Sequence, residues 1–163
     1  MRNRLIKGSI ATLVAAGAVL GLAASPVPAG ATDHHKFAAN IIQLNGQNEV
    51  PAADPDGKAL MAYVAFGDHF CYAWAAKDID PPVAAHIHAG AAGVNGGIVV
   101  MLQLPDPAAH ECITAVPDDT PNTIMVLTQS ELDAIIDNPA GFYANVHTAP
   151  FPAGAIRGQL ARD

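Results

Sequence analysis

The chain has 163 residues, of which 51% are hydrophobic and 14% charged, and its formal net charge at pH 7 is −7. This acidic, lysine-poor composition argues against nucleic acid or anionic membrane lipid as a partner. The length is sufficient for one domain with a single hydrophobic core.

The N-terminal segment has the features of a secretory signal peptide. Its first residues carry three positive charges, at Arg2, Arg4 and Lys7. An uncharged apolar stretch follows over 10–24, and Ala29-Gly30-Ala31 fits the small-x-small pattern of a cleavage site. The apolar stretch is short and ends in prolines and small residues, which argues against a retained membrane anchor. We therefore expect cleavage after Ala31, so that residues 1–31 are removed. The secreted product would be a single domain over 32–163, with its core over about 37–160 and no membrane span.

Eight short runs of β-forming residues, broken by Gly, Pro, Asn and Asp, predict strands. These runs cover residues 37–44, 58–66, 69–77, 83–89, 97–104, 123–127, 141–148 and 154–160. Loops are expected at 51–57, 78–82, 90–96 and 105–122. One helix is expected over 129–137, because Thr128 and Glu131 form a capping box and Asn138-Pro139 would end it. The pattern predicts an all-β fold, an antiparallel Greek-key β-sandwich or barrel of about seven or eight strands with one short helix.

The chain contains two cysteines, Cys71 and Cys112. In an exported protein such a pair is expected to form a structural disulfide, with Cα atoms roughly 4.4–6.8 Å apart. The bridge would connect the third predicted strand to the loop over 105–122.

Two of the predicted strands carry a polar face. Side chains two positions apart on a strand point to the same side. His86 and His88 therefore lie together on one face of their strand. Tyr143, Asn145 and His147 share one face of theirs. Any chemistry of this chain is expected on these polar faces.

The turn at Pro150-Phe151-Pro152 predicts a hairpin between the last two strands. Antiparallel pairing would place Asn145 near Arg157 and Tyr143 near Gln159. The polar face would then extend onto the last strand.

Several separated motifs resemble the CHRD (chordin-type) domain. They are LNGQNEVP at 44–51, AHIHAG at 85–90, GVNGG at 93–97, GFYANVHT at 141–148 and GAIRGQL at 154–160. The chain departs from the family pattern at Ala91-Ala92 in the glycine loop and at Ala155, where an acidic residue is common. The resemblance covers about residues 37–160 and is closest to single-domain bacterial members, whose cysteine pair looks similar. It implies an extracellular β-rich domain. In chordin such domains belong to an antagonist of secreted growth factors, whereas the role of stand-alone bacterial members is mostly unknown.

A metal site is one interpretation of the polar face. His86, His88 and His147 could share one ion, and three imidazoles with an open position suit zinc or copper. Glu49 is the nearest candidate carboxylate. A fixed cation such as Arg157 beside a divalent ion is unfavourable unless an anion lies between them. There is also a looser likeness to copper–zinc superoxide dismutase, an exported β-sandwich with a His-x-His strand at its copper site, although its other ligands have no clear counterpart here.

The other interpretation is that these polar groups only connect strands. The expected bonds are from His86 to a loop carbonyl, from His147 to Asn145 or Thr148, and from Arg157 to a carboxylate or to the loop after Gly90. No serine lies in a nucleophile motif, and the glycines at 90–97 join two strands and do not open a helix, so they form no phosphate loop. The sequence therefore favours a secreted binding or structural module without catalysis or a required cofactor, for an extracellular protein or cell-surface ligand that it does not name. The alternative is a protein that binds copper, or else zinc, with superoxide dismutase-like activity as one form.

Overall fold

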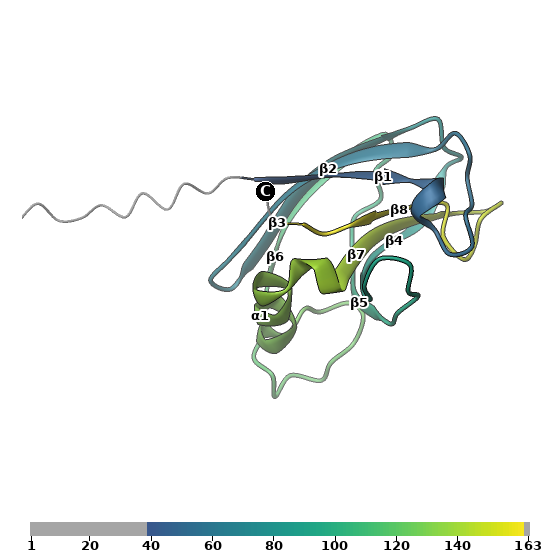
Figure 1. The fold of residues 1–163 in the computed structure, drawn as a ribbon. Helices are drawn as coiled ribbons and strands as arrows, with labels where there is room; N and C mark the ends of the chain where they lie inside the picture. Colours follow the sequence, from purple (N-terminus) through teal and green to yellow (C-terminus); the bar gives the residue numbers. More distant parts are fainter. Residues whose placement is uncertain (1–38, 162–163) are drawn as a thin grey trace, which may run out of the picture. The chain divides into compact units, whose positions relative to one another are not determined.

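The computed structural model describes residues 39–161, and the predicted signal peptide lies outside them. The described chain forms eight strands, one α-helix and two short 3-10 helices (Figure 1). In chain order these are β1 (Asn40–Asn45), η1 (Gly46–Asn48), β2 (Lys58–Phe66), β3 (His69–Lys77), β4 (Pro82–Ala89), β5 (Ile98–Met101), β6 (Ala108–Thr114), α1 (Gln129–Asp137), η2 (Pro139–Gly141), β7 (Phe142–Thr148) and β8 (Ile156–Gln159).

All eight strands pair antiparallel in one sheet with the order β5-β4-β7-β8-β1-β2-β3-β6. The sheet curls, as Figure 1 shows, and the inner faces of its two halves contribute to one core. Ile42, Met61 and Phe70 enter this core from one half, and Ile87 and Val146 from the other. The predicted antiparallel all-β fold is confirmed, and it takes the form of one curled sheet, closer to a barrel than to two stacked sheets.

The helix α1 has the bounds that the sequence predicts. Thr128 Oγ1 accepts the N–H of Glu131 at 3.4 Å, and Glu131 Oε2 accepts the N–H of Thr128 at 2.9 Å, which completes the capping box. Leu132 and Ile135 are fully buried and belong to the core. No helix within residues 39–161 is long and apolar enough to cross a membrane.

The prediction of a strand over 123–127 is wrong. This apolar run makes a turn, in which the N–H of Val126 donates to the carbonyl of Thr123 at 3.0 Å. Leu127 enters the core, whereas Met125 is 69% exposed. A short apolar run does not by itself distinguish a strand from a turn that buries one of its side chains.

One strand was not predicted from the sequence. This strand, β6, lies within the segment 105–122, where the sequence predicts a loop. Its sequence AAHECIT has few large apolar residues and gives only a weak strand signal. Pairing with β3 holds it in the sheet, and the hydroxyl of Tyr72 donates to Glu111 Oε2 at 2.8 Å across the two strands.

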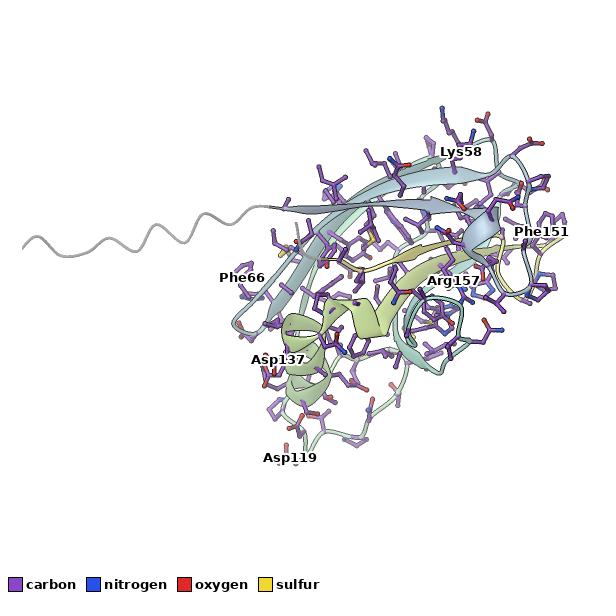
Figure 2. All side chains as sticks on the ribbon, viewed as in Figure 1. Lys58, Phe66, Asp119, Asp137, Phe151 and Arg157 are labelled. Carbon is purple, nitrogen blue, oxygen red and sulfur yellow. A yellow bond between two sulfur atoms is a disulfide. The ribbon has the colours of Figure 1, made fainter. Side chains whose placement is uncertain are left out.

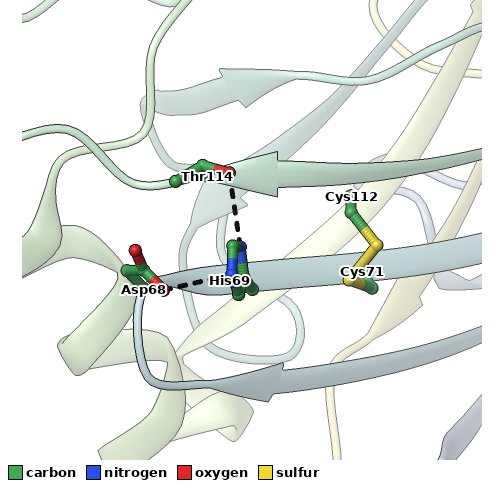
Figure 3. Close-up of a disulfide and its surroundings, with 5 residues drawn as sticks. All are labelled: Asp68, His69, Cys71, Cys112 and Thr114. Carbon is green, nitrogen blue, oxygen red and sulfur yellow. Dashed lines mark hydrogen bonds and ion pairs between the residues drawn. A yellow bond between two sulfur atoms is a disulfide. The ribbon is translucent and has the colours of Figure 1, made fainter.

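Cys71 and Cys112 form the predicted disulfide, but the bridge joins two strands and not a strand to a loop (Figure 3). The two residues lie directly opposite each other in the β3–β6 pair, and their Cα atoms are 3.9 Å apart. This is closer than the roughly 4.4–6.8 Å expected, because opposed positions on adjacent antiparallel strands bring Cα atoms near each other. On the same two strands, His69 Nδ1 lies 3.3 Å from Thr114 Oγ1. The disulfide thus ties the edge strand β6 to the sheet.

Candidate metal centre

The candidate site lies on the polar face of β4, β7 and β8. Two rows of side chains cross these strands, one with His86, Asn145 and Arg157 and the next with His88, Tyr143 and Gln159. The predicted register of the last two strands is confirmed, with Asn145 opposite Arg157 and Tyr143 opposite Gln159. His147 lies on the same face of β7, two residues after Asn145.

The loop between β4 and β5 covers this polar face. Tyr143 Oη accepts the N–H of Gly96 at 3.2 Å, and Arg157 Nη1 donates to the carbonyl of Val94 at 3.2 Å. The two histidines of β4 are only 6% and 7% exposed. Figure 2 shows Arg157 inside the fold and Phe151 at its periphery, on the turn between β7 and β8. Exclusion of water from this face strengthens every electrostatic interaction within it.

Three imidazoles converge beneath the loop. One ring nitrogen from each of His86, His88 and His147 forms a group whose members all lie within 4.8 Å of one another. His86 Nδ1 and His147 Nε2 lie 3.1 Å apart. Metal–nitrogen bonds are about 2.0–2.1 Å long, so two ligands of one tetrahedral ion lie about 3.3 Å apart. Ring movements on the order of 1 Å would bring all three nitrogens to such a spacing.

Backbone carbonyls fix which nitrogens face the centre. His88 Nδ1 lies 3.0 Å from the carbonyl oxygen of Gly96, and His147 Nδ1 lies 3.0 Å from that of Pro152. A carbonyl only accepts, so each Nδ1 carries the proton and each Nε2 of the neutral ring keeps a free lone pair. The nitrogens that face the centre are therefore Nε2 of His88 and His147, together with Nδ1 of His86, which lies against His147 Nε2. His86 contacts His147 and not the loop carbonyl expected for it, and His147 contacts the carbonyl of Pro152 and not Asn145 or Thr148.

Within the described residues, the buried polar atoms without a hydrogen-bond partner are His88 Nε2, Asn145 Oδ1, Glu49 Oε1 and Thr148 Oγ1. Thr148 lies on the opposite face of β7 from Asn145 and His147. The other three atoms belong to residues of the polar face or to the partner of Arg157, and all three are acceptors in the forms just described. Buried acceptors without a donor are costly, and a cation satisfies several of them at once.

Burial also keeps the imidazoles in the form that binds metal. Desolvation lowers the pKa of His86 to about 4, and repulsion by His147 and His88 acts in the same direction. Desolvation is also the main cause that lowers the pKa of His88. Both rings are therefore neutral at pH 7, which is the form in which histidine binds metal.

Comparison with known proteins identifies the family. The family model of the CHRD domain matches residues 41–160. The chain belongs to the CHRD domain family. Searches among curated proteins and among solved structures found no match. The three converging histidines all lie within the part of the CHRD domain that the family model covers.

Glu49 of this CHRD domain is not among the three converging groups. Its Oε2 accepts from Arg157 Nε at 3.0 Å and Nη2 at 2.9 Å, and both side chains are almost fully buried. Desolvation raises the pKa of Glu49, although attraction to Arg157 opposes the rise. Gly154 packs against the carboxylate, and a Cβ at this position would collide with Glu49 Oε1. The backbone φ of Gly154, 131°, is also a value that favours glycine.

Tyr143 links the ion pair to the histidines. Its ring is stacked on His88 with centroids 4.8 Å apart and planes 2° apart. The Cζ atom of Arg157 lies 3.9 Å from the centroid of the same ring. The tyrosine ring therefore holds the imidazole of His88 in a fixed orientation, which is the role of a supporting group around a metal ligand.

Other groups in this CHRD domain hold the surrounding loops. Gln159 Nε2 donates to the carbonyls of Gly90 and Phe142, at 2.9 and 2.6 Å. Asn95, which the sequence analysis did not select, bonds Arg157 through Oδ1 and the carbonyl of Val50 through Nδ2. Its position inside the GVNGG motif was the available signal. The carbonyls that orient the imidazoles leave no signal in residue type.

Proposed function

We propose that this chain is an exported CHRD module that binds one transition-metal ion, copper before zinc. The ligands are Nδ1 of His86 and Nε2 of His88 and His147. The observation that carries the proposal is the convergence of one ring nitrogen from each of these three histidines, two of which are oriented by backbone carbonyls. Export is supported by the predicted signal peptide and by the disulfide, which is typical of an oxidising compartment.

The chemistry of the donor set supports a borderline metal. Imidazole nitrogens suit copper and zinc, whereas magnesium and calcium prefer oxygen ligands. Three protein ligands leave a further coordination position available, and the partly exposed ring of His147 marks the side from which an ion would enter. Superoxide dismutase-like activity is an extension of this function, to be assayed on copper-loaded protein beside a variant that binds no metal.

A module that binds an extracellular partner is the second candidate. It is supported by exposed apolar side chains on the outer face of the sheet, where Ile41 is 55% and Leu60 52% exposed. These side chains lie on β1 and β2, whereas the three histidines lie on β4 and β7, so the two candidate functions use different strands.

The test is the metal content and metal affinity of the exported protein. The full chain is expressed with its own residues 1–31, purified without a polyhistidine tag, and titrated with copper and zinc. We expect one equivalent per chain. His88→Ala should abolish binding, and His110→Ala, which removes an exposed histidine of β6, should leave it unchanged. Wild-type protein that binds neither ion, or equal binding by His88→Ala, would contradict the proposal.

A further inference from the structure

The three imidazoles bring no negative charge to a bound ion. His88 and His147 keep the Nδ1 proton that each donates to a carbonyl, and both rings stay neutral when Nε2 binds. His86, bound through Nδ1, is neutral as well. An ion in this site therefore keeps its whole charge unless another group compensates for it.

Arg157 prevents Glu49 from providing that compensation. Glu49 is the carboxylate next to the site, because its partner Arg157 lies over the ring of Tyr143, which is stacked on His88. Its Oε2 is engaged twice by Arg157, so the buried pair has no net charge. Among the described residues, the group whose ligand atoms converge consists of the three histidines and contains no carboxylate.

This distribution of charge discriminates between ions. The free energy of moving an ion out of water rises with the square of its charge, and repulsion by a fixed guanidinium rises in proportion to the charge. Both effects disfavour a divalent ion more than a monovalent one. Ligand type does not decide the matter, because imidazole suits copper and zinc alike.

We infer that the site selects monovalent copper, Cu(I), over divalent ions, and that Arg157 is the residue that sets this selectivity by holding Glu49 in an ion pair. The inference rests on the proposed metal site. Arg157 acts through Glu49 and not as a ligand.

The experiment compares the affinities of the exported full-length protein for Cu(I) and Zn(II). Each affinity is measured by competition with a chromophoric chelator under anaerobic conditions. Ascorbate keeps the copper reduced and does not reduce the disulfide. Ag(I) serves as a monovalent probe that does not change oxidation state. We expect Cu(I) and Ag(I) to bind more tightly than Zn(II).

Matched variants assign the selectivity to the ion pair. Arg157→Gln frees the carboxylate of Glu49, and the ratio of Cu(I) to Zn(II) affinity should fall about tenfold or more, as expected for one unit charge near the ion. The double variant Glu49→Gln/Arg157→Gln is neutral again and should return toward the wild-type ratio. Glu49→Gln alone leaves the guanidinium uncompensated and should raise the ratio, which tests the inference even if Arg157→Gln does not fold.

The outcomes separate the two proposals. If wild-type protein binds neither Cu(I) nor Zn(II), the metal site itself is wrong. If it binds both with similar affinity, the metal site stands and the selectivity is wrong. A Cu(I) preference that neither Glu49→Gln nor Arg157→Gln changes would show that the ion pair does not set it.

Discussion

His86 Nδ1 and His147 Nε2 lie 3.1 Å apart on neighbouring strands, although 61 residues separate them in the sequence. Two ligands of one tetrahedral ion need about the same separation, roughly 3.3 Å. Without an ion, His86 donates its Nδ1 proton to His147, whose own Nδ1 proton is committed to the carbonyl of Pro152. Binding of an ion at Nδ1 of His86 would require this proton to move to Nε2 of the same ring, which keeps the ring neutral.

The free energy of unfolding of the metal-free protein should fall as the pH falls from about 6.5 toward 4. The pKa of His86 is lowered to about 4 and that of His88 is also lowered, so the unfolded chain binds protons over this interval that the folded chain does not. The contribution of these two histidines to the free energy of unfolding is fully present above their pKa in the unfolded chain. Its loss as the pH falls to about 4 should amount to about 1–3 kcal/mol. Urea unfolding at several pH values measures it.

His86→Gln is the matched variant for this pH effect and should lose less stability over the same interval. Glu49, whose pKa is raised by burial, acts in the opposite direction at the acidic end and is present in both proteins. An identical pH dependence in wild type and variant would be the contrary result.

Removal of one partner of the buried ion pair should be more damaging than removal of both. Arg157→Met leaves the carboxylate of Glu49 buried without its guanidinium, and such losses cost about 3–5 kcal/mol. Glu49→Gln/Arg157→Met leaves no unpaired charge and should recover part of this loss. Guanidinium chloride unfolding of both variants gives the comparison, and equal destabilisation by the two would refute the role assigned to the pair.

Gly154→Ala should destabilise the protein and disturb the ion pair. The new methyl group would lie against Glu49 Oε1, at a backbone conformation with φ of 131°. A cost of roughly 1–3 kcal/mol is expected from the strained conformation alone. Gly97→Ala is the control, because a Cβ there meets nothing within 4 Å. The melting temperatures of both variants test this, and the prediction fails if Gly154→Ala and Gly97→Ala melt at the same temperature.

Loss of the disulfide should weaken β6 and leave the metal site intact. The bridge closes a loop of 41 residues, which corresponds to about 4 kcal/mol in the chain-entropy description. Cys71→Ala/Cys112→Ala should therefore unfold at lower denaturant concentration, with hydrogen exchange rising first along β6. Its metal affinity should match the wild type, since the histidines lie on β4 and β7. Loss of metal binding in this variant would contradict the separation of the two features.

The polar face could be predicted from the sequence because period-two alternation is strong in the segments that became β4 and β7. His86 and His88 share a face with Asn145 for that reason, and the turn at 150–152 fixed the register that brings in Arg157. The β6 strand could not be predicted, because its stability comes from long-range pairing and a cross-strand disulfide.

Contacts of the site between residues far apart in the sequence could not be predicted from it either. The pairing of Glu49 with Arg157 joins residues 108 apart. The carbonyls of Gly96 and Pro152 orient two imidazoles through backbone atoms that every residue possesses. Residue types and spacing therefore indicated which histidines to examine, and tertiary structure was needed to assign their nitrogens.

The most direct test of the central claim is the 15N NMR spectrum of the histidine rings, recorded before and after addition of one equivalent of Ag(I). Before addition, His88 and His147 should both show a protonated Nδ1. After addition, the resonances of His86 Nδ1, His88 Nε2 and His147 Nε2 should shift together, while those of His110 stay in place. Ring resonances of these three histidines that do not respond to the ion would contradict the metal centre.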